Sequence, residues 1–347
     1  MTHHNHPLLS VRGLSVGLSD VDGRSAHVLE DVDLTVAASE SVGLVGESGS
    51  GKSVLARTVL GLHPRTTHIT AQGGISFAGN ELLGLTPRAH RQTLGTDVSM
   101  IFQDPSSSLN PVVRVGAQIL EATHRRQSSA HQRRALLTGL LESVGLTDVE
   151  RIARAYPSEL SGGQRQRVGI AAALAGAPRL LMADEPTTAL DVSVQRTILD
   201  LLDQLRHERS LAMIHVTHDL ALLSGRSDRI IVLYAGRVME DGPTPQVLTQ
   251  PAHPYTRALM EMRPRLRRPQ PLPLPQIRGD LPRLDQPRTG CPFAPRCALA
   301  DTRCHSERPP TTPVPESTLG HVAACWRTVE AAALAVPLRE PAGRSHP

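Results

Sequence analysis

The chain has 347 residues, of which 39% are hydrophobic, 20% charged and only 2% aromatic, and its net charge is +4. A chain longer than roughly 250–300 residues is expected to hold one large domain and an appendage. The small net charge and the scarcity of aromatic rings argue against nucleic acid as a partner. No apolar run approaches the ~18 residues needed to cross a bilayer, and the polar start Met1–His6 predicts no secretory signal. We therefore expect a cytoplasmic location, with any membrane role exerted through a partner.

The first third of the chain predicts strands followed by helices. Residues 8–62 alternate strand-like and turn-like segments, and the apolar stretch Ser41–Gly46 predicts a buried strand that ends in a glycine-rich loop. Residues 63–95 predict a hairpin and a short helix. From Val112 to Leu146 apolar residues recur at three-to-four spacing, which predicts helices.

The middle of the chain predicts buried strands that alternate with helices. Ser161 opens a helix that we expect to end at Pro178, and two apolar segments after it predict strands on either side of a helix over Val192–Arg209. These strands are Arg179–Asp184 and Leu211–Asp219. Residues 229–242 predict a closing hairpin that turns at Gly236. The alternation predicts an α/β domain over residues 1–262, with an α-helical subdomain at about 104–167.

Beyond residue 262 the composition changes abruptly. The next segment is rich in Pro and Arg, which predicts an extended linker, and the chain after Pro337 predicts a disordered tail. All four cysteines lie between these two segments. We therefore expect a separate C-terminal extension, residues 263–347, that carries a small four-cysteine lobe.

A phosphate-binding loop follows the buried strand Ser41–Gly46. Glycines allow backbone N–H groups to surround phosphates, and the helix that follows points its positive end at the same anion. Lys52 is the only lysine of the chain, and it supplies a compact charge to the phosphates, while Ser53 offers a hydroxyl ligand to Mg²⁺. The residues of the predicted loop are Gly46, Glu47, Ser48, Gly49, Ser50, Gly51, Lys52 and Ser53.

Two carboxylates end the strand Arg179–Asp184. At the carboxyl end of a parallel strand both face the crevice where ligands of open α/β sheets bind. We expect Asp184 to hold Mg²⁺ and Glu185 to orient and polarise the attacking water. After neighbouring strands, His218 is placed to donate a hydrogen bond to the terminal phosphate, and Gln103 to reach Mg²⁺ or the water. His215 lies inside its strand and is expected to be a core residue.

A second glycine-rich helix start follows about 110 residues after the phosphate loop. Leu160-Ser161-Gly162-Gly163-Gln164 combines a capping serine with free backbone N–H groups, which predicts another anion site.

The order of these motifs resembles that of the ATP-binding subunits of ABC transporters. The resemblance rests on the phosphate loop, Gln103, LSGGQ, LLMADEP, TALD and VTHD, and covers about residues 8–260. It implies a head-to-tail pair of ATPase subunits, in which the signature residues serve the ATP held by the phosphate loop of the partner. These residues are Ser161, Gly162, Gly163 and Gln164. The resemblance further implies that Asp191 couples the two ATP sites.

A narrower resemblance connects the chain with ATPases of the dipeptide, oligopeptide and nickel importers. It rests on MIFQDPSSSLNP, YPSELSGGQRQRV, HPYTRALM and GCPFAPRC. It implies two membrane permease subunits, an extracellular peptide-binding protein that acts through them, and a place at the cytoplasmic face of the membrane. Alternatives are a nickel importer, an ABC-type ATPase that acts on nucleic acid, and an ATP-binding regulator. Such ATPases usually stack the adenine on an aromatic residue near the position of Leu18, where this chain has none; the ring of His27 is a weak substitute.

The four cysteines, Cys291, Cys297, Cys304 and Cys325, lie within 35 residues of sequence. A disulfide is not expected in a reducing compartment. The gaps of five, six and twenty residues lack the close pairs typical of structural zinc and favour a [4Fe-4S] cluster, with Zn²⁺ as the alternative and four free thiols as a third possibility. We expect Arg296 and Arg303 to offset the negative charge of such a centre.

Overall fold

The computed structural model describes residues 7–19, 25–64, 67–86, 89–90, 95–104, 108–121, 123, 129–187, 191–262, 277, 279–285, 289–315, 317 and 320–333. The Pro- and Arg-rich linker, the tail after Pro337 and Thr188–Leu190 of the TALD motif therefore lie outside the described residues. No helix in these ranges is long and apolar enough to span a bilayer.

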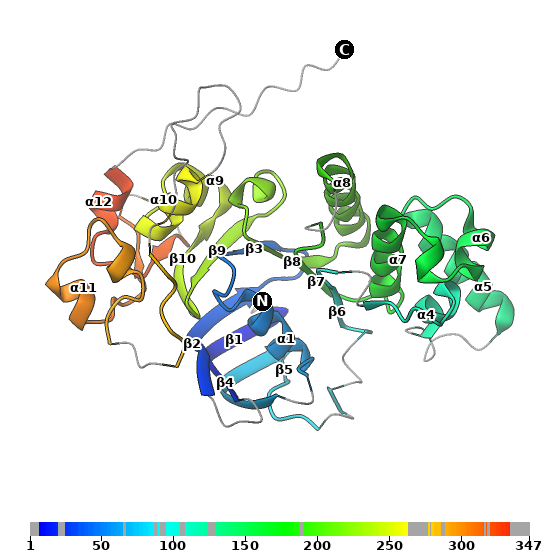
Figure 1. The fold of residues 1–347 in the computed structure, drawn as a ribbon, viewed down its shortest axis with the longest axis horizontal. Coiled ribbons are helices and arrows are strands. Elements are labelled where there is room, and N and C mark those ends of the chain that lie inside the picture. Colours follow the sequence, from blue (N-terminus) through cyan, green and yellow to red (C-terminus); the bar gives the residue numbers. More distant parts are fainter. Residues whose placement is uncertain are drawn as a thin grey trace, which may run out of the picture.

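An antiparallel sheet forms one layer, with strands in the order β2-β1-β4-β5 (Figure 1). Its strands are β1 (Leu9–Ser19), β2 (Ser25–Val36), β4 (His68–Phe77) and β5 (Asn80–Glu81). Apolar side chains of β1 and β2 alternate with more exposed ones, as in a sheet with one face on the core. This layer packs on the main sheet around a shared cluster that includes Leu14, Val32 and Leu44.

The main sheet has the order β11-β12-β10-β9-β3-β8-β7-β6. Its central strands β9, β3, β8, β7 and β6 are parallel. The bounds are β3 (Ser41–Val45), β6 (Val98–Ile101), β7 (Leu180–Asp184), β8 (Ala212–Thr217), β9 (Arg229–Tyr234), β10 (Arg237–Pro243), β11 (Thr312–Pro313) and β12 (Val322–Ala323). β3, β7 and β8 are buried along their whole length, as strands covered on both faces require.

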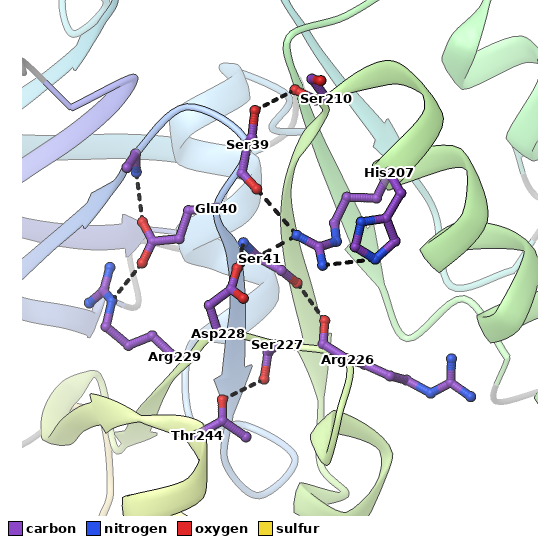
Figure 2. A network of polar contacts seen from close by, with 12 residues as sticks. Ser39, Glu40, Ser41, His207, Ser210, Arg226, Ser227, Asp228, Arg229 and Thr244 are labelled. Atoms are coloured by element: carbon purple, nitrogen blue, oxygen red, sulfur yellow. Dashed lines mark hydrogen bonds and ion pairs between the residues drawn. The ribbon is translucent and has the colours of Figure 1, made fainter. Parts of the chain in front are cut away.

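A network of polar contacts anchors β3 at its amino end, opposite the phosphate loop (Figure 2). The backbone N–H of Ser41 donates to Asp228 Oδ2 (2.8 Å), and its hydroxyl donates to the carbonyl of Arg226 (2.8 Å). Beside it, Arg229 Nε donates to Glu40 Oε1 (2.9 Å). These contacts connect the start of β3 to β9 and to the segment before it, and so fix the strand that carries the loop.

Helices connect the parallel strands and form an insert between β6 and β7. α1 (Lys52–Leu60) follows β3, and α8 (Val192–Arg209) connects β7 to β8 with the bounds that the sequence predicts. The insert contains α4 (Val115–Glu121), α5 (Ala130–Ser143), α6 (Val149–Arg154), the 3-10 turn η1 (Pro157–Glu159) and α7 (Gly162–Leu174). These elements pack around a cluster that includes Ile119, Leu141 and Ile152 and that continues into α8 and strands β6, β7 and β8. The insert is thus a helical subdomain, and its last helix, α7, ends at Leu174, short of Pro178.

The C-terminal part continues the main sheet instead of forming a separate lobe. β12 pairs antiparallel with β10, with Val322 opposite Asp241 and Ala323 opposite Glu240. A buried contact next to this pairing stabilises it: His321 Nε2 lies 2.8 Å from Glu240 Oε1. The other elements are η2 (Leu220–Leu223), α9 (Thr244–Thr249), α10 (Pro254–Glu261), η3 (Ala294–Arg296), α11 (Thr302–Ser306) and α12 (Thr328–Ala333). The helical subdomain and this extension lie at opposite ends of the molecule (Figure 1).

Candidate active site

The phosphate loop lies between β3 and α1, where the sequence predicts it. Gly49 and Gly51 have φ of 80° and 105°, a region that favours glycine. A methyl group on Gly46 would lie 2.1 Å from the carbonyl oxygen of Leu233, so the neighbouring strand requires glycine there. The loop therefore needs its glycines both for its turns and for close packing.

The side chain of Lys52 is turned into the loop. Its Nζ donates to the carbonyls of Gly46 (2.7 Å) and Glu47 (2.9 Å) and contacts Ser50 Oγ (3.4 Å). Burial lowers the pKa of Lys52, and nearby carboxylates, Glu185 foremost, act against that shift. The ammonium group is thus held in a narrow cradle of acceptors, a geometry suited to a point charge that binds phosphate oxygens.

Asp184 ends β7 beside the start of α1. The hydroxyl of Ser53 donates to its Oδ1 at 3.0 Å. Burial raises the pKa of Asp184, while the hydrogen bond from Ser53 lowers it. A hydroxyl and a carboxylate at this distance are hard oxygen donors of the kind that Mg²⁺ prefers, so these residues fit a magnesium ion bound together with phosphate.

Glu185 brings the three predicted catalytic side chains together. Its Oε1 lies 3.0 Å from His218 Nδ1, and its Oε2 accepts from Gln103 Nε2 at 3.3 Å. The residue itself has φ of 44°, a strained conformation for a side chain other than glycine. His215, in contrast, is buried in β8, and burial lowers its pKa to about 4, in agreement with the predicted core role.

The signature residues lie on the helical subdomain, away from the phosphate loop of their own chain. Ser161 caps α7: its Oγ accepts from Gln164 N (3.3 Å), and Gln164 Oε1 accepts from Ser161 N (3.1 Å). Among the described residues, the signature contributes none to the walls of the phosphate-loop cavity. Asp191 caps α8 through Val194 N (3.0 Å), and a hydrogen bond from Ser193 lowers its pKa.

A cavity of about 950 Å³ extends over the phosphate loop. Its walls include Glu47 to Gly49, Gly51 to Val54, Gln103, Glu185 and His218, together with Val28. The remaining walls come from the end of α10 and from the extension. The sequence alone does not place either of these parts at the ATP site. Their wall residues are Leu259, Met262, Ile277, Gly279, Asp280, Leu281, Leu284 and Arg296.

Arg296 of the extension is paired with Glu47 of the phosphate loop. Its Nη1 lies 2.7 Å from Glu47 Oε2 and its Nη2 3.1 Å from Glu47 Oε1. The backbone N–H of Glu47 also donates to Tyr255 Oη of α10 (2.7 Å). Arg296, expected to offset charge at the cysteines, thus pairs with a carboxylate of the phosphate loop. Arg303 is likewise engaged elsewhere: it pairs with Glu307 (2.9 Å) and covers the ring of Trp326 (3.5 Å).

The four cysteines line one small cavity of about 10 Å³ between η3, α11 and the end of β12. All four are free thiols. Burial raises the pKa of Cys291 to about 11 and that of Cys325 to about 12. Within the described ranges no group of three or more potential ligands is arranged to hold a metal. The four cysteines thus line a common space of about one water molecule without forming a ligand set.

A parallel sheet with a phosphate loop, a carboxylate pair at a nearby strand end and a helical insert defines an ATP-binding cassette. The ABC transporter family profile matches residues 29–188, and the oligopeptide/dipeptide transporter C-terminal region matches residues 239–304. Solved cassettes have the same fold. The cbiO1 protein of a Clostridium perfringens ABC transporter complex gives a TM-score of 0.58 at 25% identity, over 70% of this chain and 90% of that one. A cassette solved as a dimer with ADP and Pi gives 0.60 at 28% identity, over 68% and 98%.

Curated relatives match over nearly the whole chain. A peptide ABC transporter ATP-binding protein of Sinorhizobium fredii is 44% identical over 325 residues, 93% of this chain and 96% of that protein. A peptide import ATP-binding protein of Brucella abortus is 44% identical over 306 residues, 87% and 91%. The chain belongs to the ATP-binding subunits of ABC transporters, which bind and hydrolyse ATP.

Proposed function

We propose that this chain powers the import of peptides through a membrane ABC transporter. The observation that carries the proposal is the combination of an ABC-type phosphate-loop site with a C-terminal region of the oligopeptide/dipeptide transporter type. Relatives named for a peptide ABC transporter and for peptide import, which align over 96% and 91% of their length, support the same cargo class.

Each residue of the site has a role in this proposal. Glu185 orients and polarises the water that attacks the terminal phosphate, and His218 and Gln103 hold its carboxylate and contact phosphate and water. Lys52 and the loop N–H groups bind the phosphates. Ser53, Asp184 and Gln103 would hold Mg²⁺, which would neutralise charge on the phosphate oxygens.

The second half of each ATP site comes from a partner subunit, of the same or a homologous chain. What supports this is the distance of Ser161–Gln164 from the cavity of their own chain, with the start of α7 half exposed. In the proposed dimer, each signature helix start closes over the nucleotide of the other subunit, and Asp191 connects the two sites. Two permease subunits complete the transporter, with an extracellular peptide-binding protein acting through them and the ATPases at the cytoplasmic face of the membrane.

Reconstitution tests the cargo. The chain is purified with the permeases encoded beside it, and its ATPase rate is measured in liposomes with the cognate binding protein. We expect oligopeptides or dipeptides to stimulate ATP hydrolysis and to accumulate in the lumen, and Glu185→Gln to abolish both. Stimulation by Ni²⁺ alone would assign the nickel alternative, and stimulation by nucleic acid without permeases would overturn the transport proposal.

We also propose a metal centre at Cys291, Cys297, Cys304 and Cys325, with a [4Fe-4S] cluster ahead of Zn²⁺. Its support is that four thiols from distant positions face one cavity. Thiols are donors of the kind such a group needs, but the described residues form no ligand set there, so metal binding would have to deprotonate and rearrange the thiols. Anaerobic purification followed by metal analysis and a visible spectrum tests it: zinc without iron refutes the cluster, and neither metal refutes the centre.

A further inference from the structure

The base end of the ATP cavity lacks the aromatic ring that the family usually provides. Residues 18–26 of the chain contain no Phe, Tyr or Trp. The loop binds only the phosphates of ATP. The purine base must therefore contact another part of the cavity.

The C-terminal extension presents apolar side chains at the rim of the phosphate loop. Ile277, Leu281 and Leu284 line the cavity and are half-buried. A methyl group on Gly49 would lie 3.4 Å from Leu281 Cδ1, so this leucine stands next to the loop itself. Val28 of β2 lines the same cavity, and its carbonyl adjoins Gly51.

Both ends of this apolar segment are fixed to the cassette. At one end Arg296 Nη2 donates to the carbonyl of Ile277 (3.0 Å) while the same guanidinium pairs with Glu47. At the other end the backbone N–H of His27 donates to the carbonyl of Leu284 (2.8 Å). The side chain of Arg296 is only 5% exposed, so the anchoring pair is largely shielded from water. A surface held in this way is pre-organised and loses little entropy when a ligand binds.

We propose that Ile277, Leu281 and Leu284 form the surface on which the purine base of bound ATP packs, in place of an aromatic ring near Leu18. Aliphatic side chains supply a flat base with apolar contact but no ring stacking. The cavity, at about 950 Å³, lies within the ~300–1,000 Å³ range typical of small-molecule sites. The extension is then part of the nucleotide site. Because every ABC ATPase binds ATP, this proposal does not depend on the peptide cargo.

Comparison of ATP with a ligand that lacks the base isolates this surface. Binding of MgATP and of magnesium tripolyphosphate to the full-length chain is measured by calorimetry for the wild type and for Leu281→Ala/Leu284→Ala. Removing two aliphatic contacts from the base is expected to weaken ATP binding about tenfold. Tripolyphosphate affinity should stay within about twofold, which also reports that the variant is folded and its loop intact.

Matched variants distinguish loss of the base surface from a general weakening of the extension. Val329→Ala removes an apolar side chain from exposed α12 of the same extension and should leave both ligands unaffected. Leu281→Phe, which restores a ring, should retain or improve the preference for ATP over tripolyphosphate. An unchanged ATP affinity in the double variant overturns the proposal. An equal loss of affinity for ATP and tripolyphosphate in the double variant also overturns it. The proposal is likewise overturned if Leu18→Ala, and not the double variant, removes the preference for ATP over tripolyphosphate.

Discussion

At the scale of single residues, Glu185 combines backbone strain with two side-chain contacts. Its positive φ and its hydrogen-bonding distance to both His218 and Gln103 fix the carboxylate at the mouth of the phosphate cavity. The cost of holding a non-glycine residue in this conformation is about 1–3 kcal/mol, and such outliers occur mostly at functional sites.

Replacement of this carboxylate tests its role. Glu185→Gln keeps the size of the side chain and leaves Lys52, Ser53 and Asp184 in place. We expect ATP binding to persist while kcat falls about 10²–10⁴-fold, because general-base catalysis contributes that much. The trapped ATP should hold two subunits together, visible as an ATP-dependent dimer in gel filtration. Steady-state activity within a few-fold of the wild type would contradict the assignment.

Lys52 offers a second test at this scale. Three acceptors lie within 2.7–3.4 Å of its Nζ in a buried cradle, and the planar fork of Arg is larger and differently shaped. Lys52→Arg should therefore lose MgATP affinity almost as severely as Lys52→Ala, in calorimetry or nucleotide fluorescence. Lys52→Arg conserves the positive charge and so also serves as the control. Substantial MgATP affinity in this variant would show that a positive charge alone is enough to bind the phosphates.

Most of these residues could be predicted because local sequence dictates them. The phosphate loop needs glycines and one lysine in a row, and Asp184 and Glu185 directly follow an apolar strand. The pairing of Arg296 with Glu47 could not be predicted, since the partners are 249 positions apart and nothing near either one indicates the other.

At the scale of elements, capping decides which boundaries the sequence predicts well. α8 begins after Asp191, whose side chain accepts from Val194 N, and ends at Arg209, followed by Ser210 in the left-handed region. Both signals are local, so its bounds follow from the sequence. β12, by contrast, is a two-residue strand that pairs with the nearby β11 and, on its other side, with β10. β10 lies about 80 residues earlier in the chain, so the sequence around β12 does not indicate that the strand joins the main sheet.

The attachment of this strand depends on a buried polar contact. His321 and Glu240 have side chains that are 1% and 0% exposed, and the carboxylate also accepts from the backbone N–H groups of Ala252 and His253. His321→Ala removes one hydrogen-bond partner of the buried Glu240 carboxylate, a change that costs about 1.5–3 kcal/mol. We expect the lost stability to appear in urea unfolding and as early proteolysis of the extension.

The control is His305→Ala, at an exposed position of α11, which should change stability by less than about 0.5 kcal/mol. If the pair is the cause, Glu240→Gln combined with His321→Ala should cost less than the sum of the two single changes. Strict additivity would mean that His321 acts by packing alone.

At the scale of the whole molecule, the parts expected to contact ATP lie at opposite ends of the molecule. The extension covers the phosphate loop on one side, and the signature helix stands at the opposite end on the helical subdomain (Figure 1). A chain arranged in this way cannot close its own site, so the fold itself favours a head-to-tail pair. The sequence predicts the motifs that would meet across such a pair, but not that the extension folds back on the loop, because long-range contacts made by single side chains leave no periodic pattern.

Stability of the whole cassette should depend on pH through its buried histidines. Burial lowers the pKa of His215 to about 4 and that of His253 to about 3, whereas an unfolded chain titrates near ~6.5. Below pH ~6.5 the unfolded state therefore binds more protons, and stability that is fully present above this value is lost as the pH falls. For His215 alone the expected loss between pH 8 and pH 5 is about 2 kcal/mol. Urea unfolding of the wild type and of His215→Gln at both pH values measures the contribution of His215. The free energy of unfolding of the variant should fall by about 2 kcal/mol less between pH 8 and pH 5. Equal losses in the two proteins would show that His215 does not cause the pH dependence.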